Sequence, residues 1–142
     1  MKPVSELLKK HQGTLWHVRP DESVFGALEL LAGYEVGALM VMDGGRLVGV
    51  ISERDYTRKV ALQGRNSKET RVAEIMTRNV VTVGPGTGTR ACMALMSEKK
   101  IRHLPVLDGN MVLGMISIRD IMDDIIADHE TTIAQLESYI TS

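Results

Sequence analysis

The chain has 142 residues, 44% hydrophobic and 25% charged, which is the balance of a folded domain and not of a disordered or fibrous protein. Lys+Arg 17 against Asp+Glu 18 give a formal net charge of -1, which argues against the broad basic field of a nucleic-acid-binding protein. The single cysteine, Cys92, cannot form an internal disulfide, and no apolar run reaches the roughly 20 residues of a membrane helix. We therefore expect a cytoplasmic protein that binds neither nucleic acid nor membrane.

The chain contains an internal repeat. When the segment that begins at Val18 is aligned with the segment that begins at Val83, a single offset of 65 residues holds without a gap as far as Tyr56 and Ile121. About a dozen of roughly 39 aligned positions are identical, and apolar positions match apolar ones between them. The chain is therefore predicted to be a tandem duplication.

Both repeats are predicted to follow the order β-α-β-β-α, which makes the fold class α/β (α+β), with the repeats packed about a pseudo-twofold axis. Short apolar runs bounded by proline or by Asp-Gly turns predict strands over residues 15–18, 38–42 and 47–51, and again over 80–83, 104–107 and 112–116. Apolar spacing of i, i+3, i+4 predicts a helix after the first strand of each repeat. Its expected N-cap is Ser23 in the first repeat and Thr87 or Thr89 in the second.

These patterns divide the chain into four parts. We expect an N-terminal leader helix over 1–13, the first repeat over 14–66, the second over 67–127 and a C-terminal helical extension over 128–142. A repeat of about 60 residues buries too little apolar surface to be stable alone. The last helix extends beyond its repeat and carries apolar residues, so it is a candidate for dimerisation or partner binding; they are Ile121, Ile125, Ile126, Ile133, Leu136 and Ile140.

The same short motif closes both repeats, GVISERD at 49–55 and GMISIRD at 114–120, each after a strand-turn-strand unit. Together with IRHLPV at 101–106, it makes the chain resemble a tandem cystathionine-β-synthase-type (CBS) domain pair, or Bateman module, of the small stand-alone bacterial type. The resemblance covers about residues 14–127. It implies a sensor that binds AMP, ADP, ATP, S-adenosylmethionine or NAD(H) in clefts between the repeats and passes the ligand state to an effector protein. It also implies a homodimer that is not an enzyme and requires no cofactor.

The motif places a serine and an aspartate three residues apart at the start of a helix, on one face. A carboxylate accepts hydrogen bonds from both hydroxyls of a ribose, and a serine hydroxyl with free backbone N–H groups suits a phosphate. By resemblance, Asp55 and Asp120 would hold ribose, and Ser52 and Ser117 would contact phosphate or ribose. The same spacing is also that of a capping box, which would make the motif structural.

Further residues are assigned to the two pockets by resemblance. Phosphate contacts fall to Arg102, His103, Arg54 and Arg119, and the adenine pocket to the backbone at Val80, Val81, Thr82, Leu104 and Pro105. Two alternatives remain open: Arg102 and His103 form a solvated strand edge, and Arg54 and Arg119 pair with nearby carboxylates. Because Pro105 has no N–H, we expect either an edge position or a missing ladder bond in its strand.

The two sites differ in sequence. Where the second has Arg102 and His103, the first has Gly37 and Ala38, and Trp16 and His17 stand where the second has Val81 and Thr82. Trp16 either stacks on a base or packs in the core. We expect the second site to bind an anionic nucleotide. We expect the first to bind a different adenosyl ligand or to take its charge from Arg58, Lys59 or arginines of the other repeat. The rival hypothesis is a constitutive structural or dimerisation protein with degenerate pockets.

Two other features predict no chemistry. The four histidines have no partners at ligand spacing, so no metal site is expected. Cys92 lies on an apolar helix face without an activating base, which favours core packing.

Overall fold

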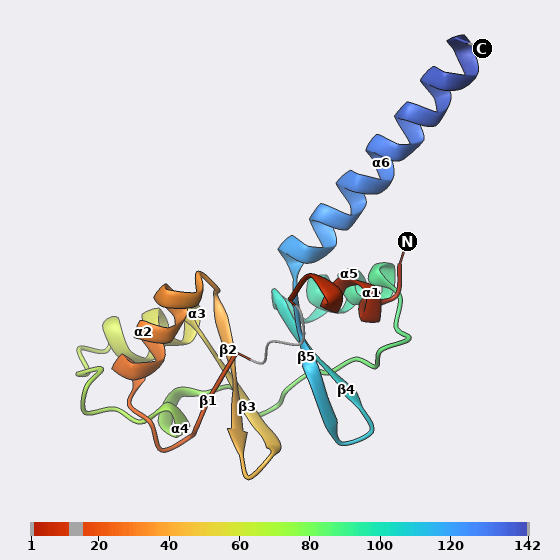
Figure 1. Cartoon of the computed structure of the whole chain (residues 1–142). Coiled ribbons are helices and arrows are strands. Elements are labelled where there is room, and N and C mark those ends of the chain that lie inside the picture. Colours follow the sequence, from red (N-terminus) through yellow and green to blue (C-terminus); the bar gives the residue numbers. More distant parts are fainter. Residues whose placement is uncertain (1, 12–15, 142) are drawn as a thin grey trace. The chain divides into compact units, whose positions relative to one another are not determined.

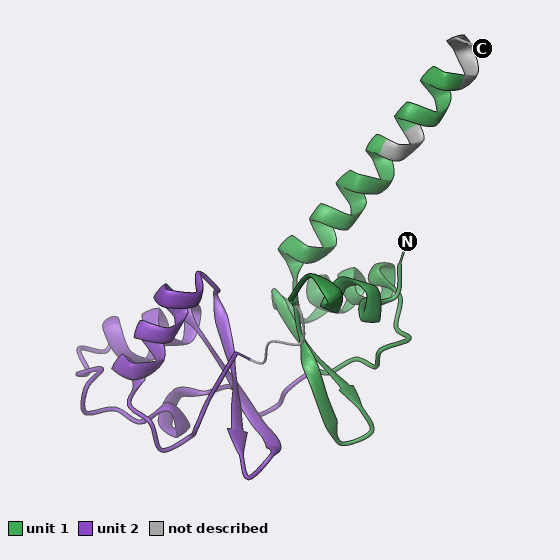
Figure 2. Cartoon of the chain, viewed as in Figure 1, with its two compact units in different colours: residues 1–13, 82–142 green, residues 14–81 purple. Residues whose placement is uncertain are grey.

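The computed structural model describes residues 2–11 and 16–141, except the side chains of 131, 132 and 139–141. The chain divides into two compact units, unit 1 with Met1–Gly13 and Thr82–Ser142 and unit 2 with Thr14–Val81 (Figure 2). The units therefore cut across the ranges expected from the sequence. The leader joins the unit that holds the second repeat, and residues 67–81 join the unit that holds the first.

Unit 2 is built on a three-stranded sheet of order β1-β2-β3 (Figure 1). Its elements are β1 (His17–Val18), α2 (Val24–Tyr34), β2 (Ala38–Asp43), β3 (Arg46–Ser52), α3 (Glu53–Tyr56), the π-helical segment η2 (Thr57–Ala61) and α4 (Val72–Ile75). β1 runs parallel to β2, and β2 and β3 form the predicted hairpin. The expected N-cap of α2 is confirmed, because the hydroxyl of Ser23 accepts a hydrogen bond from Gly26 N at 3.0 Å.

Unit 1 repeats the hairpin and its bulge. Its elements are α1 (Val4–Leu8), the 3₁₀ turn η1 (Lys9–His11), α5 (Thr89–Lys99), β4 (His103–Asp108), β5 (Met111–Ser117) and α6 (Ile118–Thr141). Cys92 is fully buried on α5, and burial raises the pKa of its thiol, which confirms the packing role. None of the described helices, α6 included, combines the length and apolarity needed to cross a membrane.

The strand predicted over 80–83 is wrong. Only Val83 pairs, in a single parallel bridge with Val106. In unit 2 the matching contact is longer, because Met40 N donates to Trp16 O and two residue pairs follow. The residue equivalent to Met40 is Pro105, which has no N–H to donate. The missing ladder bond expected at Pro105 therefore shortens the strand to one bridge.

Neither threonine proposed as the N-cap of α5 serves as one. Gly88 occupies that position with no side-chain cap, and Thr89 is already the first helical residue. The hydroxyl of Thr87 is used one turn earlier, where it accepts a hydrogen bond from Gly84 N at 3.1 Å.

The segment before the aligned part of each repeat packs on the other repeat. We call residues 2–11 the N-terminal arm and residues 67–77 the connector arm. The N-terminal arm docks in unit 1, where Val4 N donates to Thr87 O and α1 contacts β5. The connector arm docks in unit 2, where Val72, Ile75 and Met76 join the core. Each arm brings a short apolar helix that its own repeat does not bury, which explains the composition of the two units.

A glycine in each sheet makes room for its arm. A Cβ on Gly49 of β3 would lie 2.7 Å from Met76 Sδ, and one on Gly114 of β5 would lie 3.0 Å from Leu8 Cδ2. These are the glycines that open the two GxxSxxD motifs. The motif glycine is therefore explained by arm packing.

Candidate functional site

In unit 2 the motif forms a complete capping box at the start of α3. Asp55 N donates to Ser52 Oγ at 3.2 Å, and Ser52 N donates to Asp55 Oδ2 at 2.9 Å. The Ser52 hydroxyl donates to the same oxygen at 3.0 Å. The capping alternative is thus correct as geometry, and it also fixes the rotamer of Asp55.

The second carboxylate oxygen of Asp55 is occupied as well. The Thr77 hydroxyl donates to Oδ1 at 3.3 Å, and Lys59 Nζ lies 3.1 Å from it. Lys59 also donates to the carbonyl of Ile75 at 2.8 Å, which anchors the ammonium between α4 and the motif. We call Ser52, Asp55, Lys59 and Thr77 the Asp55 half-site. Both oxygens of its carboxylate are engaged by the chain itself.

Of these two partners of Asp55, the sequence pointed to Lys59 only, as a candidate source of charge for the first site, and Thr77 was missed. The i, i+4 spacing of Asp55 and Lys59 on one helical segment was a readable signal for the ion pair. Thr77 gave none, because its contact depends on how the connector arm docks.

In unit 1 the motif aspartate has a different environment. Ser117 N donates to Asp120 Oδ2 at 2.8 Å, and Asp120 N donates to Ser117 Oγ at 3.2 Å. His11 Nε2, from the N-terminal arm, lies 3.1 Å from the same Oδ2. We call Ser117, Asp120, His11, Arg102 and His103 the Asp120 half-site. The contacts from Ser117 N and His11 Nε2 thus both reach Oδ2 of this carboxylate.

The residue one helical turn after Asp120 reverses the charge found in unit 2. Asp124 stands where unit 2 has Lys59, and its side chain is 2% exposed. Lys2 Nζ lies 3.8 Å from Asp124 Oδ1, so the N-terminal arm meets α6 at both of its ends. The Asp120 half-site therefore lacks the internal ammonium that saturates Asp55.

Of the predicted basic pair, Arg102 carries a permanent positive charge. Arg102 is exposed just before β4, and its carbonyl accepts a hydrogen bond from Ile118 N at 2.8 Å, which ties it to the start of α6. Burial lowers the pKa of His103; the charge of Asp120 opposes that shift and Arg102 adds to it. Because its pKa lies below the ordinary 6.5, His103 is mainly a neutral imidazole at pH 7, which donates a hydrogen bond from one ring nitrogen and accepts one at the other.

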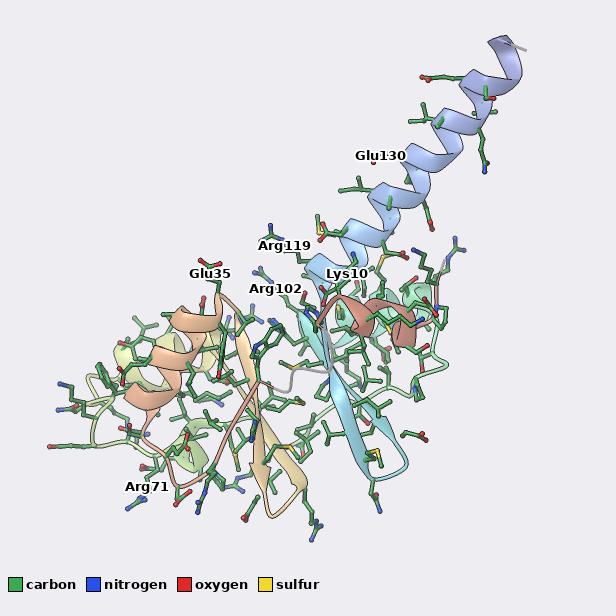
Figure 3. The ribbon with its side chains drawn as sticks, viewed as in Figure 1. Lys10, Glu35, Arg71, Arg102, Arg119 and Glu130 are labelled. Atoms are coloured by element: carbon green, nitrogen blue, oxygen red, sulfur yellow. The ribbon has the colours of Figure 1, made fainter. Side chains whose placement is uncertain are left out.

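Cations gather where α6 begins. In Figure 3 the side chains of Arg102 and Arg119 project from the same end of unit 1, and Lys10 of the N-terminal arm is labelled near that end in this view. All three residues are exposed. Such a group of cations above the N-terminus of a helix favours an anion.

The remaining predicted residues fall into both units. Val80 and Val81 close unit 2 and are half-buried, and Thr82 opens unit 1 and is exposed. Leu104 and Pro105 are buried in β4. The other predicted site residues belong to unit 2. His17 and Arg54 are exposed. The carbonyl of Gly37 accepts a hydrogen bond from Glu53 N, and Ala38 pairs with Ser52 across the hairpin.

Trp16 packs against the apolar core of unit 2 and is half-buried. Its ring centroid lies 6.2 Å from that of Tyr34. This contact is the one that the core alternative expects. Within the described residues no cluster of three or more histidine, cysteine or acidic side chains could hold a metal ion.

The neutral state of His103 predicts a pH dependence of stability. Its folded pKa lies below the ordinary 6.5, so the unfolded chain binds more protons as the pH falls through that value. This part of the stability is fully present above about pH 6.5 and declines toward the lowered folded pKa, by at most about 1.4 kcal/mol per pH unit. Urea unfolding of His103→Gln should show a smaller loss than the parent chain between about pH 7.5 and pH 5.5. Identical losses in the two proteins would contradict a neutral, half-buried His103.

Comparison with known proteins agrees with this architecture. The family model of the CBS domain matches the chain twice, over residues 4–62 and 72–127. The chain is 37% identical over 137 residues to the CBS domain-containing protein CBSX3, mitochondrial, of Arabidopsis thaliana. That match covers 93% of this chain and 66% of the relative, so the chain spans just under two thirds of the relative's length.

Solved structures give the same picture. A protein with CBS domains from Burkholderia ambifaria MC40-6 has a TM-score of 0.86 and 47% identity, over 89% of this chain and 96% of that one. The CBS domain pair of protein MJ0100, solved in complex with 5′-methylthioadenosine and S-adenosyl-L-methionine, has a TM-score of 0.79 and 25% identity, over 90% and 98% of the two chains.

Proposed function

Because the chain belongs to the CBS-domain family, as a tandem pair of CBS repeats, we propose that it is a sensor that binds an adenosine-containing nucleotide through the Asp120 half-site. AMP, ADP, ATP and NAD(H) are the candidate ligands, and S-adenosylmethionine and methylthioadenosine join them because protein MJ0100 was solved with both. The module acts in the cytoplasm as a homodimer and passes its ligand state to a separate effector protein. It catalyses no reaction and needs no cofactor.

The observation that carries this proposal is the difference between the two motif aspartates. Asp55 has both oxygens occupied, by Ser52 on one side and by Thr77 and Lys59 on the other. The described contacts of Asp120 reach only Oδ2, which leaves Oδ1 to accept a ribose hydroxyl. The exposed cations beside the start of α6 suit the phosphate of the same ligand. The Asp120 half-site therefore has an acceptor for the sugar and donors for the anion.

Each predicted residue of the Asp120 half-site has a role in this proposal. Asp120 accepts from the ribose, and Ser117 holds that carboxylate in place through its backbone N–H. Arg102 and Arg119 pair with phosphate oxygens, and the neutral His103 contributes a hydrogen bond without a charge. Thr82, Leu104 and Pro105 supply backbone and apolar contacts for the base.

The Asp55 half-site is proposed to be the weaker one. A ribose there must displace Lys59 or Thr77 from Asp55, and Gly37 and Ala38 offer no cation in place of Arg102 and His103. This favours the degenerate-pocket hypothesis for one site only. Adenosyl ligands without a phosphate suit the Asp55 half-site better than nucleotides do.

The test uses the full chain as purified. After denaturation, any released compound is identified by mass spectrometry, and the melting temperature is measured with each candidate ligand and with GMP as the control. A ligand at 100 times its Kd stabilises the folded state by about 2.7 kcal/mol, which is easily seen as a rise in melting temperature. No released adenosyl compound together with no rise for any ligand would leave the constitutive structural protein as the function.

A further inference from the structure

The outer face of α6 carries a regular apolar stripe. Its exposed members are Met122, Ile126, Ile133 and Leu136, at 53%, 52%, 54% and 59% exposure. With His129 they are spaced 4, 3, 4 and 3 residues apart, which is the a/d spacing of a heptad repeat. The opposite face contains Ile121 and Asp124 and is buried in unit 1. The stripe is thus a second face, separate from the one that packs on the unit.

The helix is longer than its packing within unit 1 requires. It has 24 residues, which corresponds to about 36 Å. Figure 1 shows its C-terminal half extending beyond the rest of unit 1, and every side chain from Ile133 to Ser138 is exposed. Helical stability in proteins comes mainly from packing of an apolar face, so this half needs a partner. Ile140, which the sequence places on the same stripe, lies outside the described side chains.

The charges beside the stripe indicate which partner fits. Asp123, Glu130 and Glu137 occupy the e positions, so one flank of the stripe is a row of acids. In an antiparallel pair of these helices e faces e, which sets this row against its own copy. In a parallel pair e faces g, where the described residue is Ile125, so no like charges meet.

We propose that α6 pairs with α6 of a second copy of this chain as a parallel, in-register coiled coil along Met122, Ile126, His129, Ile133 and Leu136. A heptad stripe is self-complementary when it pairs in register, and the acidic flank selects the parallel orientation. The pairing assigns a surface to the homodimer of the proposed function and does not depend on nucleotide binding.

The seam contains one polar layer, His129, which meets its symmetry mate. A polar residue at a core position specifies register at a cost in stability. His129→Leu is therefore expected to tighten the dimer, by about 10-fold in dissociation constant. Leu136→Lys places two ammonium groups in the seam and is expected to weaken it by about 100-fold or more. Gln135→Lys adds the same charge one residue away, off the stripe, and should leave the dimer unchanged.

Sedimentation equilibrium of the full chain without added nucleotide measures these constants. The side chains of His129, Gln135 and Leu136 are all exposed, and the circular dichroism of each variant reports whether the chain still folds. A parent chain that stays monomeric, or a Leu136→Lys variant that dimerises as well as Gln135→Lys, would overturn the proposal. Nucleotide binding is measured in a separate experiment. A failure to bind nucleotide would therefore leave the measured dimerisation constants unaffected.

Orientation is tested by disulfide cross-linking in a Cys92→Ser background. Leu136→Cys should form a disulfide with its own copy under a glutathione redox buffer, because d faces d in a parallel pair. An antiparallel pair would instead link Leu136→Cys to Ile126→Cys when the two variants are mixed, because a faces d in that arrangement. That result, with no self-linking of Leu136→Cys, would overturn the parallel arrangement.

Discussion

Replacing Asp120 with asparagine is expected to lower the affinity for the adenosine ligand by about 10- to 100-fold, because the ribose hydroxyl at Oδ1 loses a charge-assisted hydrogen bond of roughly 1.5–3 kcal/mol. The amide also turns one acceptor into a donor, which opposes the ribose hydroxyls. Isothermal titration calorimetry with the nucleotide that gives the largest rise in melting temperature measures the loss. Unchanged affinity in Asp120→Asn would remove the Asp120 half-site as the binding site.

The matched control is Asp55→Asn. Both substitutions weaken the same capping contact, since Ser52 N and Ser117 N each donate to the aspartate of their own motif. Each variant should therefore lose a similar stability, about 1 kcal/mol. Only Asp120→Asn should lose most of the nucleotide affinity. A larger loss of affinity in Asp55→Asn would contradict the idea that Lys59 and Thr77 already saturate Asp55.

The parts of the fold that depend on neighbours in sequence could be predicted. The hairpins follow from Asp-Gly turns between apolar runs, and Ser23 caps α2 because its hydroxyl reaches a backbone N–H three residues on. The short pairing at Val83 also follows from the sequence, because Pro105 has no backbone N–H to donate to a neighbouring strand. The docking of each arm on the other repeat could not be predicted. The helices α1 and α4 are short apolar segments, and their packing partners are set only when the sheets form.

In the candidate site, too, contacts between sequence neighbours could be predicted and contacts between distant residues could not. The serine–aspartate contacts lie within one helical turn, so the spacing was sufficient to predict them. His11 reaches Asp120 across 109 residues of sequence, and Thr77 reaches Asp55 across 22, and no local pattern encodes either contact. The basic pair, Arg102 and His103, was predicted from residue type alone. Burial lowers the pKa of His103 and leaves it neutral, so only Arg102 supplies a charge. The asymmetry between the sites therefore rests on the arms as much as on the motifs.

The connector arm gives the largest expected effect on stability. Gly49→Ala is expected to lower the free energy of unfolding by about 1–3 kcal/mol, because its Cβ would lie 2.7 Å from Met76 Sδ and 2.9 Å from the carbonyl oxygen of Thr77. The sulfur can rotate away, but the carbonyl is held, since Thr77 and Val50 exchange both backbone hydrogen bonds at 2.9 and 3.0 Å. The substitution must therefore open this bridge and move Thr77 away from Asp55.

Urea unfolding measures the change, and Gly33→Ala is the matched control. A Cβ on Gly33 meets nothing within 4 Å, and the residue lies in α2, so this substitution should stabilise the chain by up to about 1 kcal/mol. Opposite signs for the same chemical change at two glycines would show that the effect comes from the docked arm and not from backbone entropy. A Gly49→Ala chain as stable as the parent would contradict the close packing of the connector arm on β3.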